Sequence, residues 1–185
     1  GYIVNEGMRL EALSLKLMEL IILNKHDFAF MQMRMDEVLH DIADTLLPIM
    51  RRKNIELNVS AHPAYVRIEF DLFKTLFLNL IDNAIKYTPP GSVISIRAKK
   101  SGGKAQISVE DNGPGIPKEM KPHIFEMFYT GKTTVADSHR SLGLGLALCL
   151  SIIEAHDGTL ILTDRNPHGC NFTFTLPLSE VTLNE

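Results

Sequence analysis

The stretch Asn79-Leu80-Ile81-Asp82-Asn83-Ala84-Ile85-Lys86-Tyr87 closes a strongly apolar segment that begins at Leu72. Asn79, Asn83 and Lys86 follow one another at steps of four and three, so they share one face of a helix. Amide oxygens can ligate Mg2+ without adding negative charge beside a triphosphate, and a lysine on the same face can neutralise phosphate oxygens. The alternative is an ordinary solvated helix face, since Asn and Lys are common surface residues.

The elements around this stretch are predicted from hydrophobic periodicity. The polar stripe belongs to a helix over 72–87, with Asp71 as its N-cap and a stop at Pro89-Pro90-Gly91. Two further helices are predicted, one running from the N-cap Asp36 towards Lys53 and one from Gly143 to Ala155. The predicted strands are Phe28–Met33, Ile55–Ser60, Tyr65–Phe70, Val93–Lys100, Ala105–Glu110, Thr159–Thr163 and Asn171–Leu176, with a hairpin turn at Ser101-Gly102-Gly103. Because strands and helices mix without strict alternation, we expect one sheet with helices stacked on one face.

The first 24 residues have the pattern of a separate helix. Apolar residues recur at helical spacing along a Glu- and Lys-bearing segment, at Ile3, Leu10, Leu13, Leu17 and Leu20. This pattern favours a seam like that of a coiled coil or a larger bundle. The alternative is a helix that packs on its own domain.

Composition narrows the classes of function. The chain has 185 residues and a net charge of -3 without charge clusters, so no nucleic-acid partner is expected. Cys149 and Cys170 are too few for a disulfide framework and fit a reducing compartment. The chain lacks an apolar run of about 18 residues, and its first residues lack the features of a signal peptide. We therefore expect a cytoplasmic fragment, whose parent protein can carry membrane segments upstream.

A second informative stretch is Val109-Glu110-Asp111-Asn112-Gly113-Pro114-Gly115-Ile116-Pro117. An ionised Asp only accepts hydrogen bonds, so at the base of a pocket Asp111 suits an exocyclic amino group such as that of adenine. Gly113 and Gly115 allow backbone conformations denied to other residues and can hinge a mobile lid. A plain turn is the alternative.

The segment after Asp111 is rich in Gly, Pro, Lys, Thr and His, and it predicts a lid over about 112–142. It ends at Ser141-Leu142-Gly143-Leu144-Gly145-Leu146, whose backbone amides at a helix start can bind phosphates. The basic residues of the lid are Lys118, Lys121, Lys132, His139 and Arg140. Gly131-Lys132-Thr133-Thr134 is not a Walker A loop, since Glu126 occupies the place of the first glycine. The glycines from Gly143 onward are not a dinucleotide fingerprint either, because no strand precedes them.

Four motifs in this order resemble the catalytic ATP-binding domain of sensor histidine kinases, in the superfamily that includes DNA gyrase, the heat-shock chaperone ATPase and mismatch-repair ATPases. The motifs are similar to the N box at 79–87, the first glycine box at 111–115, the F box at Ile124-Phe125-Glu126-Met127-Phe128 and the second glycine box at 143–146. The resemblance covers about 28–178. It implies an α/β (α+β) two-layer sandwich, in which a mixed sheet is covered on one face by three helices and preceded by an N-terminal helix.

The resemblance also implies roles for individual residues. Asn83 would ligate Mg2+ with Asn79 near the metal, and Asp111 would bind the adenine amino group with help from Thr173. Gly113 and Gly115 would hinge the lid, which Phe125 and Phe128 would anchor. Catalysis is assigned to Asn79, Asn83 and Lys86. The residues expected to bind ATP are Asn79, Asn83, Lys86, Tyr87, Asp111, Gly113, Gly115, Ile116, Lys132, Leu142, Gly143, Leu144, Gly145, Leu146 and Thr173.

Asn79 favours a kinase over a hydrolase, because related hydrolases are expected to carry a glutamate there and an amide cannot take a proton from water. The acceptor histidine is expected upstream of the chain. Family kinases carry it in a box that ends in a Thr-Pro pair, but no such pair closely follows His40-Asp41, and Pro48 lies eight residues after His40. Residues 1–26 would then be the second helix of the dimerisation and phosphoacceptor hairpin, and 27–185 the catalytic domain. The implied cofactors are ATP and Mg2+, and the implied partners are the acceptor domain of the same kinase, a response regulator and a second copy in a homodimer. The alternatives are an ATPase or serine kinase of the superfamily and a non-catalytic nucleotide-sensing dimerisation module.

Overall fold

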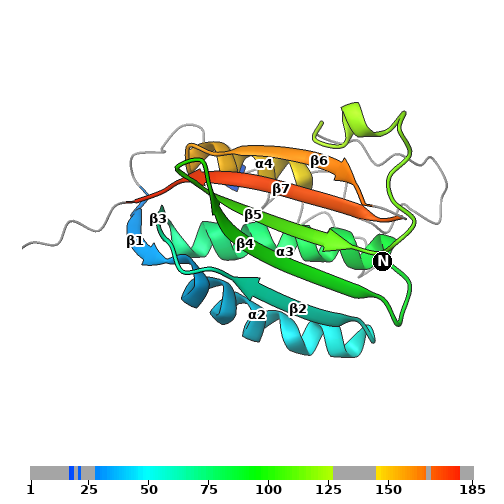
Figure 1. Ribbon diagram of the computed structural model, residues 1–185. Helices are drawn as coiled ribbons and strands as arrows, with labels where there is room; N and C mark the ends of the chain where they lie inside the picture. The colour runs from blue at the N-terminus through cyan, green and yellow to red at the C-terminus, as the bar shows by residue number, and fades with distance from the viewer. Residues whose placement is uncertain (1–16, 19–20, 22–27, 127–144, 166–167, 180–185) are drawn as a thin grey trace, which may run out of the picture.

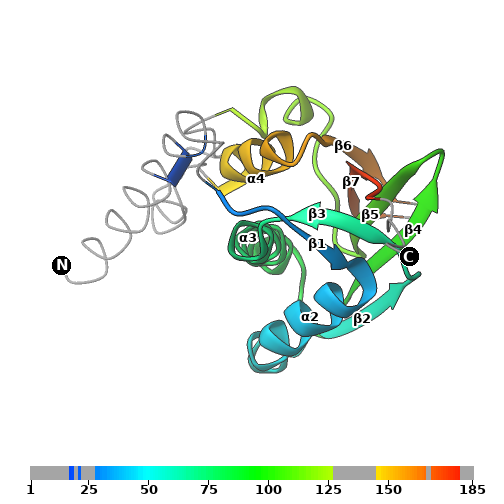
Figure 2. The same cartoon turned by 90° about the vertical axis from the view of Figure 1, so that its left-hand side faces the viewer.

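The chain folds into two layers, a mixed sheet and three helices that cover one of its faces (Figures 1 and 2). The computed structural model describes residues 17–18, 21, 28–126, 145–165 and 168–179. The helices of the covering layer are α2 (Met35–Arg52), α3 (Phe70–Tyr87) and α4 (Gly145–Ala155). The predicted two-layer sandwich with three covering helices is therefore confirmed.

The sheet has five strands in the order β2-β4-β5-β7-β6. Their bounds are β2 (Glu56–Ala61), β4 (Val93–Ser101), β5 (Lys104–Asp111), β6 (Thr159–Asp164) and β7 (Cys170–Pro177). Only β2 and β4 pair in parallel, and the other neighbours are antiparallel. Gly102 and Gly103 connect β4 to β5 at φ +58° and +77°, as a two-residue hairpin turn requires.

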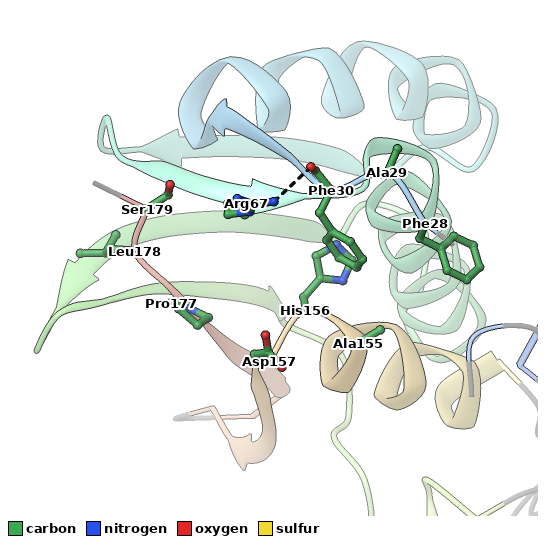
Figure 3. Close-up of a pocket in the computed structure, with 10 residues that line it drawn as sticks. All are labelled: Phe28, Ala29, Phe30, Arg67, Ala155, His156, Asp157, Pro177, Leu178 and Ser179. Carbon is green, nitrogen blue, oxygen red and sulfur yellow. Dashed lines mark hydrogen bonds between the residues drawn. The ribbon is translucent and has the colours of Figure 1, made fainter. Parts of the chain in front are cut away.

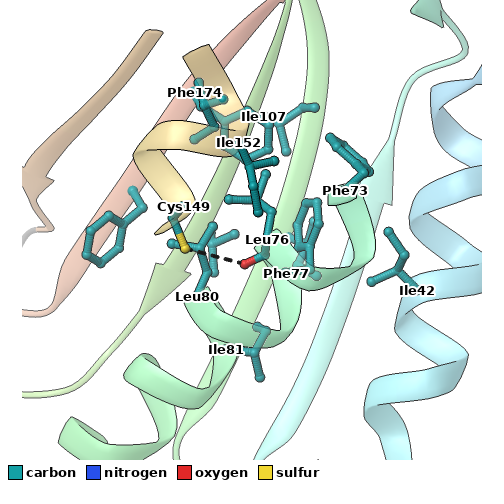
Figure 4. Close-up of a cluster of buried hydrophobic side chains, with 14 of the residues drawn as sticks. Ile42, Phe73, Leu76, Phe77, Leu80, Ile81, Ile107, Cys149, Ile152 and Phe174 are labelled. Carbon is teal, nitrogen blue, oxygen red and sulfur yellow. Dashed lines mark hydrogen bonds between the residues drawn. The ribbon is translucent and has the colours of Figure 1, made fainter. Parts of the chain in front are cut away.

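The core lies between α3 and the sheet (Figure 4). Apolar side chains recur along α3 at helical spacing, so one continuous stripe faces the sheet. Phe73 and Phe77 of this stripe pack edge to face on Phe174 of β7, with ring centroids 6.1 and 5.9 Å away. The Cys149 thiol of α4 lies in the same cluster and donates to the Leu76 carbonyl at 3.7 Å. This packing fixes how α3 is rotated, and therefore where its polar stripe points.

Two helix starts differ from the predictions. The cap of α3 is Glu69, whose carboxylate accepts from the backbone N–H groups of Asp71 and Leu72 at 3.4 and 2.7 Å. Asp71 thus lies in the first turn, because Glu69, two residues earlier, is the residue whose carboxylate reaches the free amides. The first helical residue of α2 is Met35, so Asp36 is inside the helix and pairs with Arg34 at 2.8 Å instead of capping.

A second, two-stranded sheet lies across one end of the layers (Figure 1). It pairs β1 (Met31–Arg34) with β3 (Tyr65–Ile68), so the predicted strand over 28–33 begins and ends later than expected. In the N-terminal segment, Met18 and Ile21 are buried members of the hydrophobic cluster. The rest of the predicted N-terminal helix lies outside the described residues, and its assignment to a dimerisation hairpin stays a prediction. No helix in the described ranges is both long and apolar enough to cross a membrane.

Candidate functional site

The polar stripe of α3 lies half-buried beside the start of α4. Asn79 Nδ2 donates to the Thr75 carbonyl at 2.8 Å, which fixes the orientation of the amide. A Cβ placed on Gly145 would lie 3.2 Å from Asn79 Oδ1, so only a residue without a side chain allows this approach without a shift. The first residue of α4 therefore meets the oxygen of Asn79, as expected if the two motifs form one site. Lys86 Nζ pairs with Asp82 Oδ2 at 3.1 Å.

Asp111 ends β5 and is only 8% exposed. The backbone N–H of Gly113 donates to its Oδ1 at 3.0 Å. Burial raises the pKa of the Asp111 carboxyl above its ordinary value, and hydrogen bonds from the Gly113 and Cys170 backbone, with the charge of Arg165, only partly offset this. The site thus holds an acceptor away from water, where a donor from a ligand would gain most.

Asn83 of α3 and Asp111 of β5 line one small hollow. Its other walls come from the helix, from the glycine-rich segment and from β7, and they are Ala84, Gly115, Ile116, Cys170 and Phe172. The volume is about 10 Å3, which is room for about one water molecule. A hollow of this volume is too small for a purine, so a bound purine would require part of its wall to move.

The glycine-rich segment is packed against the connection between β6 and β7. Gly169 has φ +120°, and a Cβ there would lie 2.1 Å from the Asp111 carbonyl oxygen. Gly115, at φ +84°, faces the carbonyl of Gly169. His168 Nδ1 donates to the Gly113 carbonyl at 2.9 Å. Sequence reasoning missed Gly169 and His168, and the only local signal was a glycine directly before a strand.

The described part of the segment predicted to form a lid contacts the sheet. The short helix η2 (Lys121–His123) is held by an ion pair between Lys121 and Asp164 of β6. Phe125 packs edge to face on Phe172, with ring centroids 6.2 Å apart. Of the predicted site residues, Phe128, Lys132, Leu142, Gly143 and Leu144 lie outside the described residues, and of Tyr87 only its place at the end of α3 is described.

Thr173 is not brought to this hollow. It lies on the sheet face opposite Asp111, where its hydroxyl is 3.2 Å from that of Ser108 and donates to Asn171 Oδ1 at 3.0 Å. The strand pairing explains why, because Thr173 is the partner of Ser108 and Cys170 is the partner of Asp111. Side chains alternate between the two faces along a strand, and Thr173 and Cys170 are an odd number of residues apart, so they point to different faces. The proposed help from Thr173 to the adenine is therefore wrong. The residues of β7 that line the hollow are Cys170 and Phe172, which the alternation of the strand could have indicated.

Cys170 forms part of the wall as a neutral group. Burial raises the pKa of its thiol to about 12, so almost no thiolate exists at neutral pH. The thiol therefore serves as a small apolar surface beside Asp111.

A divalent cation would depend on amide ligands here. Within the described ranges, no group of three or more His, Cys, Asp and Glu side chains could hold a metal ion. Amide oxygens of Asn79 and Asn83, completed by phosphate oxygens and water, would give Mg2+ the oxygen ligands that it prefers.

A larger hollow of about 520 Å3 lies at the opposite end of the sheet (Figure 3). Segments far apart in the chain line it, and they contribute Phe28, Ala29, Phe30, Arg67, Ala155, His156, Asp157, Pro177, Leu178 and Ser179. None of the motif residues is among them. We assign the candidate site to the smaller hollow, because the chemically suited groups converge there.

Residues 68–180 match the family described as histidine kinase-, DNA gyrase B-, and HSP90-like ATPase. The adaptive-response sensory kinase SasA of Nostoc sp. is 38% identical over 144 residues, which make up 77% of this chain and 35% of that kinase. The chain spans well under half the length of the curated relatives it matches.

Solved structures give the same result. The catalytic domain of the histidine kinase ThkA, in a nucleotide-free form, has a TM-score of 0.69 and 29% identity over 80% of this chain and 95% of that domain. ThkA in complex with the response regulator TrrA has a TM-score of 0.75 and 26% identity over 95% of this chain and 49% of that one.

Proposed function

The chain belongs to the histidine kinase-, DNA gyrase B-, and HSP90-like ATPase family as a sensor histidine kinase catalytic domain, and we propose that it transfers the γ-phosphoryl group of Mg-ATP to a histidine elsewhere in its parent protein. Family membership supports kinase or ATPase activity. The transfer to histidine, the metal and the partners are the parts that we propose.

The observation that carries the proposal is the convergence of Asn83 and Asp111 on one hollow. An amide oxygen suits a cation that is bound to phosphates, and a buried carboxylate suits the amino group of a purine. Placed on α3 and at the end of β5, the two groups would hold the two ends of one nucleotide. Gly145 and Leu146, at the start of α4 beside Asn79, would lie at the phosphate end.

Mg2+ bound at Asn83 would neutralise charge on the phosphates. Lys86 would contribute to the same neutralisation after exchanging its ion pair with Asp82 for phosphate oxygens. The chain supplies position and charge, which dominate phosphoryl transfer. The bond between the γ-phosphorus and the β,γ-bridging oxygen breaks, a bond to an imidazole nitrogen forms, and ADP leaves.

Asn79 argues for transfer rather than hydrolysis. Its amide cannot accept a proton from water, and its Nδ2 is already committed to the Thr75 carbonyl. Water at the γ-phosphate would therefore lack a base at this position, and ATP would be kept for the histidine.

The partners follow from the reaction. We propose that the acceptor histidine lies in a dimerisation domain of the parent protein, that the parent is a homodimer in the cytoplasm, and that a response regulator receives the phosphoryl group. ThkA, a structural neighbour, has been solved together with a response regulator. Residues 1–26 would form the second helix of the dimerisation and phosphoacceptor hairpin.

Isothermal titration and acceptor complementation test this proposal. The chain should bind Mg-ATP, and with γ-labelled ATP it should label an added phosphoacceptor domain of the same kinase. The Asn83→Ala variant should lose the labelling. Steady ATP hydrolysis without acceptor would favour an ATPase, binding without transfer would favour a nucleotide-sensing module, and no binding would sink the proposal.

A further inference from the structure

The connection between β6 and β7 contacts the glycine-rich segment at several points. Gly169 lies against the backbone of Asp111, so closely that any side chain would collide with it. Arg165 donates its backbone N–H to the Gly169 carbonyl at 3.1 Å, which closes the described part of the connection on itself. Asp164, just before it, pairs with Lys121 of the lid. The connection therefore lies directly behind the segment that must move for a purine to enter.

Among the described residues of this connection, only the His168 side chain forms a hydrogen bond to the glycine-rich segment. Its Nδ1 lies 2.9 Å from the Gly113 carbonyl oxygen. A carbonyl oxygen can only accept, so Nδ1 must carry the hydrogen. Gly113 in turn donates its N–H to Asp111 Oδ1 at 3.0 Å. Two hydrogen bonds in series thus link His168, through Gly113, to the Asp111 carboxylate of the candidate site.

We propose that His168 is a positioning residue for the nucleotide site. Its Nδ1–H holds the Gly113 carbonyl, so that the N–H of the same residue keeps the Asp111 carboxylate aimed into the hollow. This inference rests on the proposed function, since it assigns His168 to the purine end of the ATP site. Gly115, at φ +84°, lies just beyond the residue that His168 holds.

Three substitutions at one position separate the hydrogen bond from the bulk of the ring. His168→Ala removes the donor. His168→Asn restores a donor, because Asn Nδ2 is as many bonds from the backbone as His Nδ1. His168→Asp places an acceptor against the carbonyl and should be no better than Ala. His40→Ala, at an exposed site on α2, is the matched control.

Two measurements are needed. Isothermal titration with Mg-ATP gives the affinity, and hydrogen exchange of the nucleotide-free proteins reports the protection of the amides of Gly113, Gly115 and Ile116. We expect His168→Ala to weaken binding about fivefold, the net effect of one hydrogen bond, and to speed exchange at the hinge. His168→Asn should return both values to within about twofold of the unsubstituted chain, a rescue that general destabilisation would not give.

The outcomes distinguish the two proposals. Equal affinity and exchange in His168→Ala and His40→Ala, with normal binding by the unsubstituted chain, would overturn the role of His168 alone. Failure of His168→Asn to improve on His168→Ala would overturn it as well. Absence of binding by the unsubstituted chain would overturn the proposed function, and the role of His168 with it.

Discussion

At one end of the sheet Asp111 and Cys170 border a hollow of about 10 Å3, whereas at the other end Pro177 and Leu178 border one of about 520 Å3. The smaller hollow gathers the amide of Asn83 and a buried carboxylate, and its wall is a glycine-rich segment. The lining of the larger hollow includes residues 28–30, which precede β1, and the end of α4. The comparison teaches that the assignment of the proposed nucleotide site rests on the chemistry of the lining residues and not on the volume of the hollow.

The two ends also differ in how they are held. At the larger hollow, the His156 ring donates from Nδ1 to the Ile152 carbonyl at 2.7 Å and accepts the Glu69 N–H at 3.1 Å on Nε2. It also packs edge to face on Phe30, with ring centroids 4.9 Å apart. At the smaller hollow, close backbone contacts of Gly115 and Gly169 stand beside the packing of Phe125 on Phe172. We therefore expect substitutions at the larger hollow to change stability alone, and those at the smaller hollow to change nucleotide binding as well.

Gly169→Ala should have the largest effect, because it affects stability and binding together. The added Cβ would lie 2.1 Å from the Asp111 carbonyl oxygen at φ +120°, so the backbone of the site must shift. We expect a loss of about 4 kcal/mol in the free energy of unfolding and no measurable ATP binding. Gly91→Ala is the control, because Gly91 has φ +86° with nothing within 4 Å of an added Cβ, and it should cost only about 1 kcal/mol. Urea unfolding measures the stability and titration calorimetry measures the affinity. Equal losses of stability in Gly169→Ala and Gly91→Ala would contradict the close contact at Gly169.

His156→Ala should reduce stability without reducing affinity. It removes two hydrogen bonds and the ring contacts of a buried side chain, which together contribute about 3 kcal/mol to the free energy of unfolding. Under conditions where the variant is folded, its Kd for Mg-ATP should match that of the unsubstituted chain. His62→Ala, at an exposed site, should change unfolding by less than about 0.5 kcal/mol. A large loss of affinity in His156→Ala would remove the distinction between the two ends.

Asp111→Asn should weaken ATP binding about 30-fold, or about 2 kcal/mol, because an amide replaces the charged acceptor of the purine amino group. Asp157→Asn makes the same chemical change at the other end and should leave the affinity unchanged. Asp157 has φ +59°, a conformation that Asn also tolerates. Titration calorimetry of both variants decides whether the carboxylate matters only at the smaller hollow.

The same Asp111→Asn variant should gain stability at neutral pH. The pKa of Asp111 is raised in the fold by burial, while in the unfolded chain it returns to its ordinary value of 3.8. At pH 7 the folded state therefore holds a charge that the unfolded state solvates better, and this cost is relieved as pH falls through the raised pKa. The stability advantage of Asn should be present at pH 7 and absent below 3.8. An advantage that grows towards acid pH would refute this sign.

Arg67→Ala should have the smallest effect. Arg67 is exposed at the larger hollow and donates to the Phe30 carbonyl at 3.5 Å, the outer limit of a hydrogen bond. We expect a change of less than about 0.5 kcal/mol in unfolding and no change in the Kd for Mg-ATP. A marked change in nucleotide affinity would show that the larger hollow is linked to the site.

Much of the fold was predictable because its signals are local. The apolar spacing of 72–87 and the Gly102-Gly103 turn each depend on residues close in sequence, and α3 and the hairpin of β4 and β5 are where these signals placed them. The cap of α3 was mistaken because Asp71 and Glu69 are both good acceptors. Which of the two residues caps the helix depended on how close to the end of β3 the helix begins.

The site was predictable only in part. The face shared by Asn79 and Asn83 follows from helix geometry, and Asp111 follows from its place at a strand end. Thr173 was assigned to the wrong face of the sheet, although the alternation of Phe172, Thr173 and Phe174 contained the information. Alternation tells which residues of β7 share a face, but only the register with β5 tells which of the two faces carries Asp111.

The sequence by itself determined which groups this domain has to work with: two amides and a lysine on one helix face, a carboxylate at a strand end and glycines where the chain must turn. Those features follow from the period of a helix or strand, which each segment carries alone. Tertiary structure decided which of them meet. Packing of α3 on the sheet brings Asn83 to Asp111, and the pairing of β5 with β7 brings Gly169 and His168 against the glycine-rich segment, because contacts between distant segments depend on how the whole core closes.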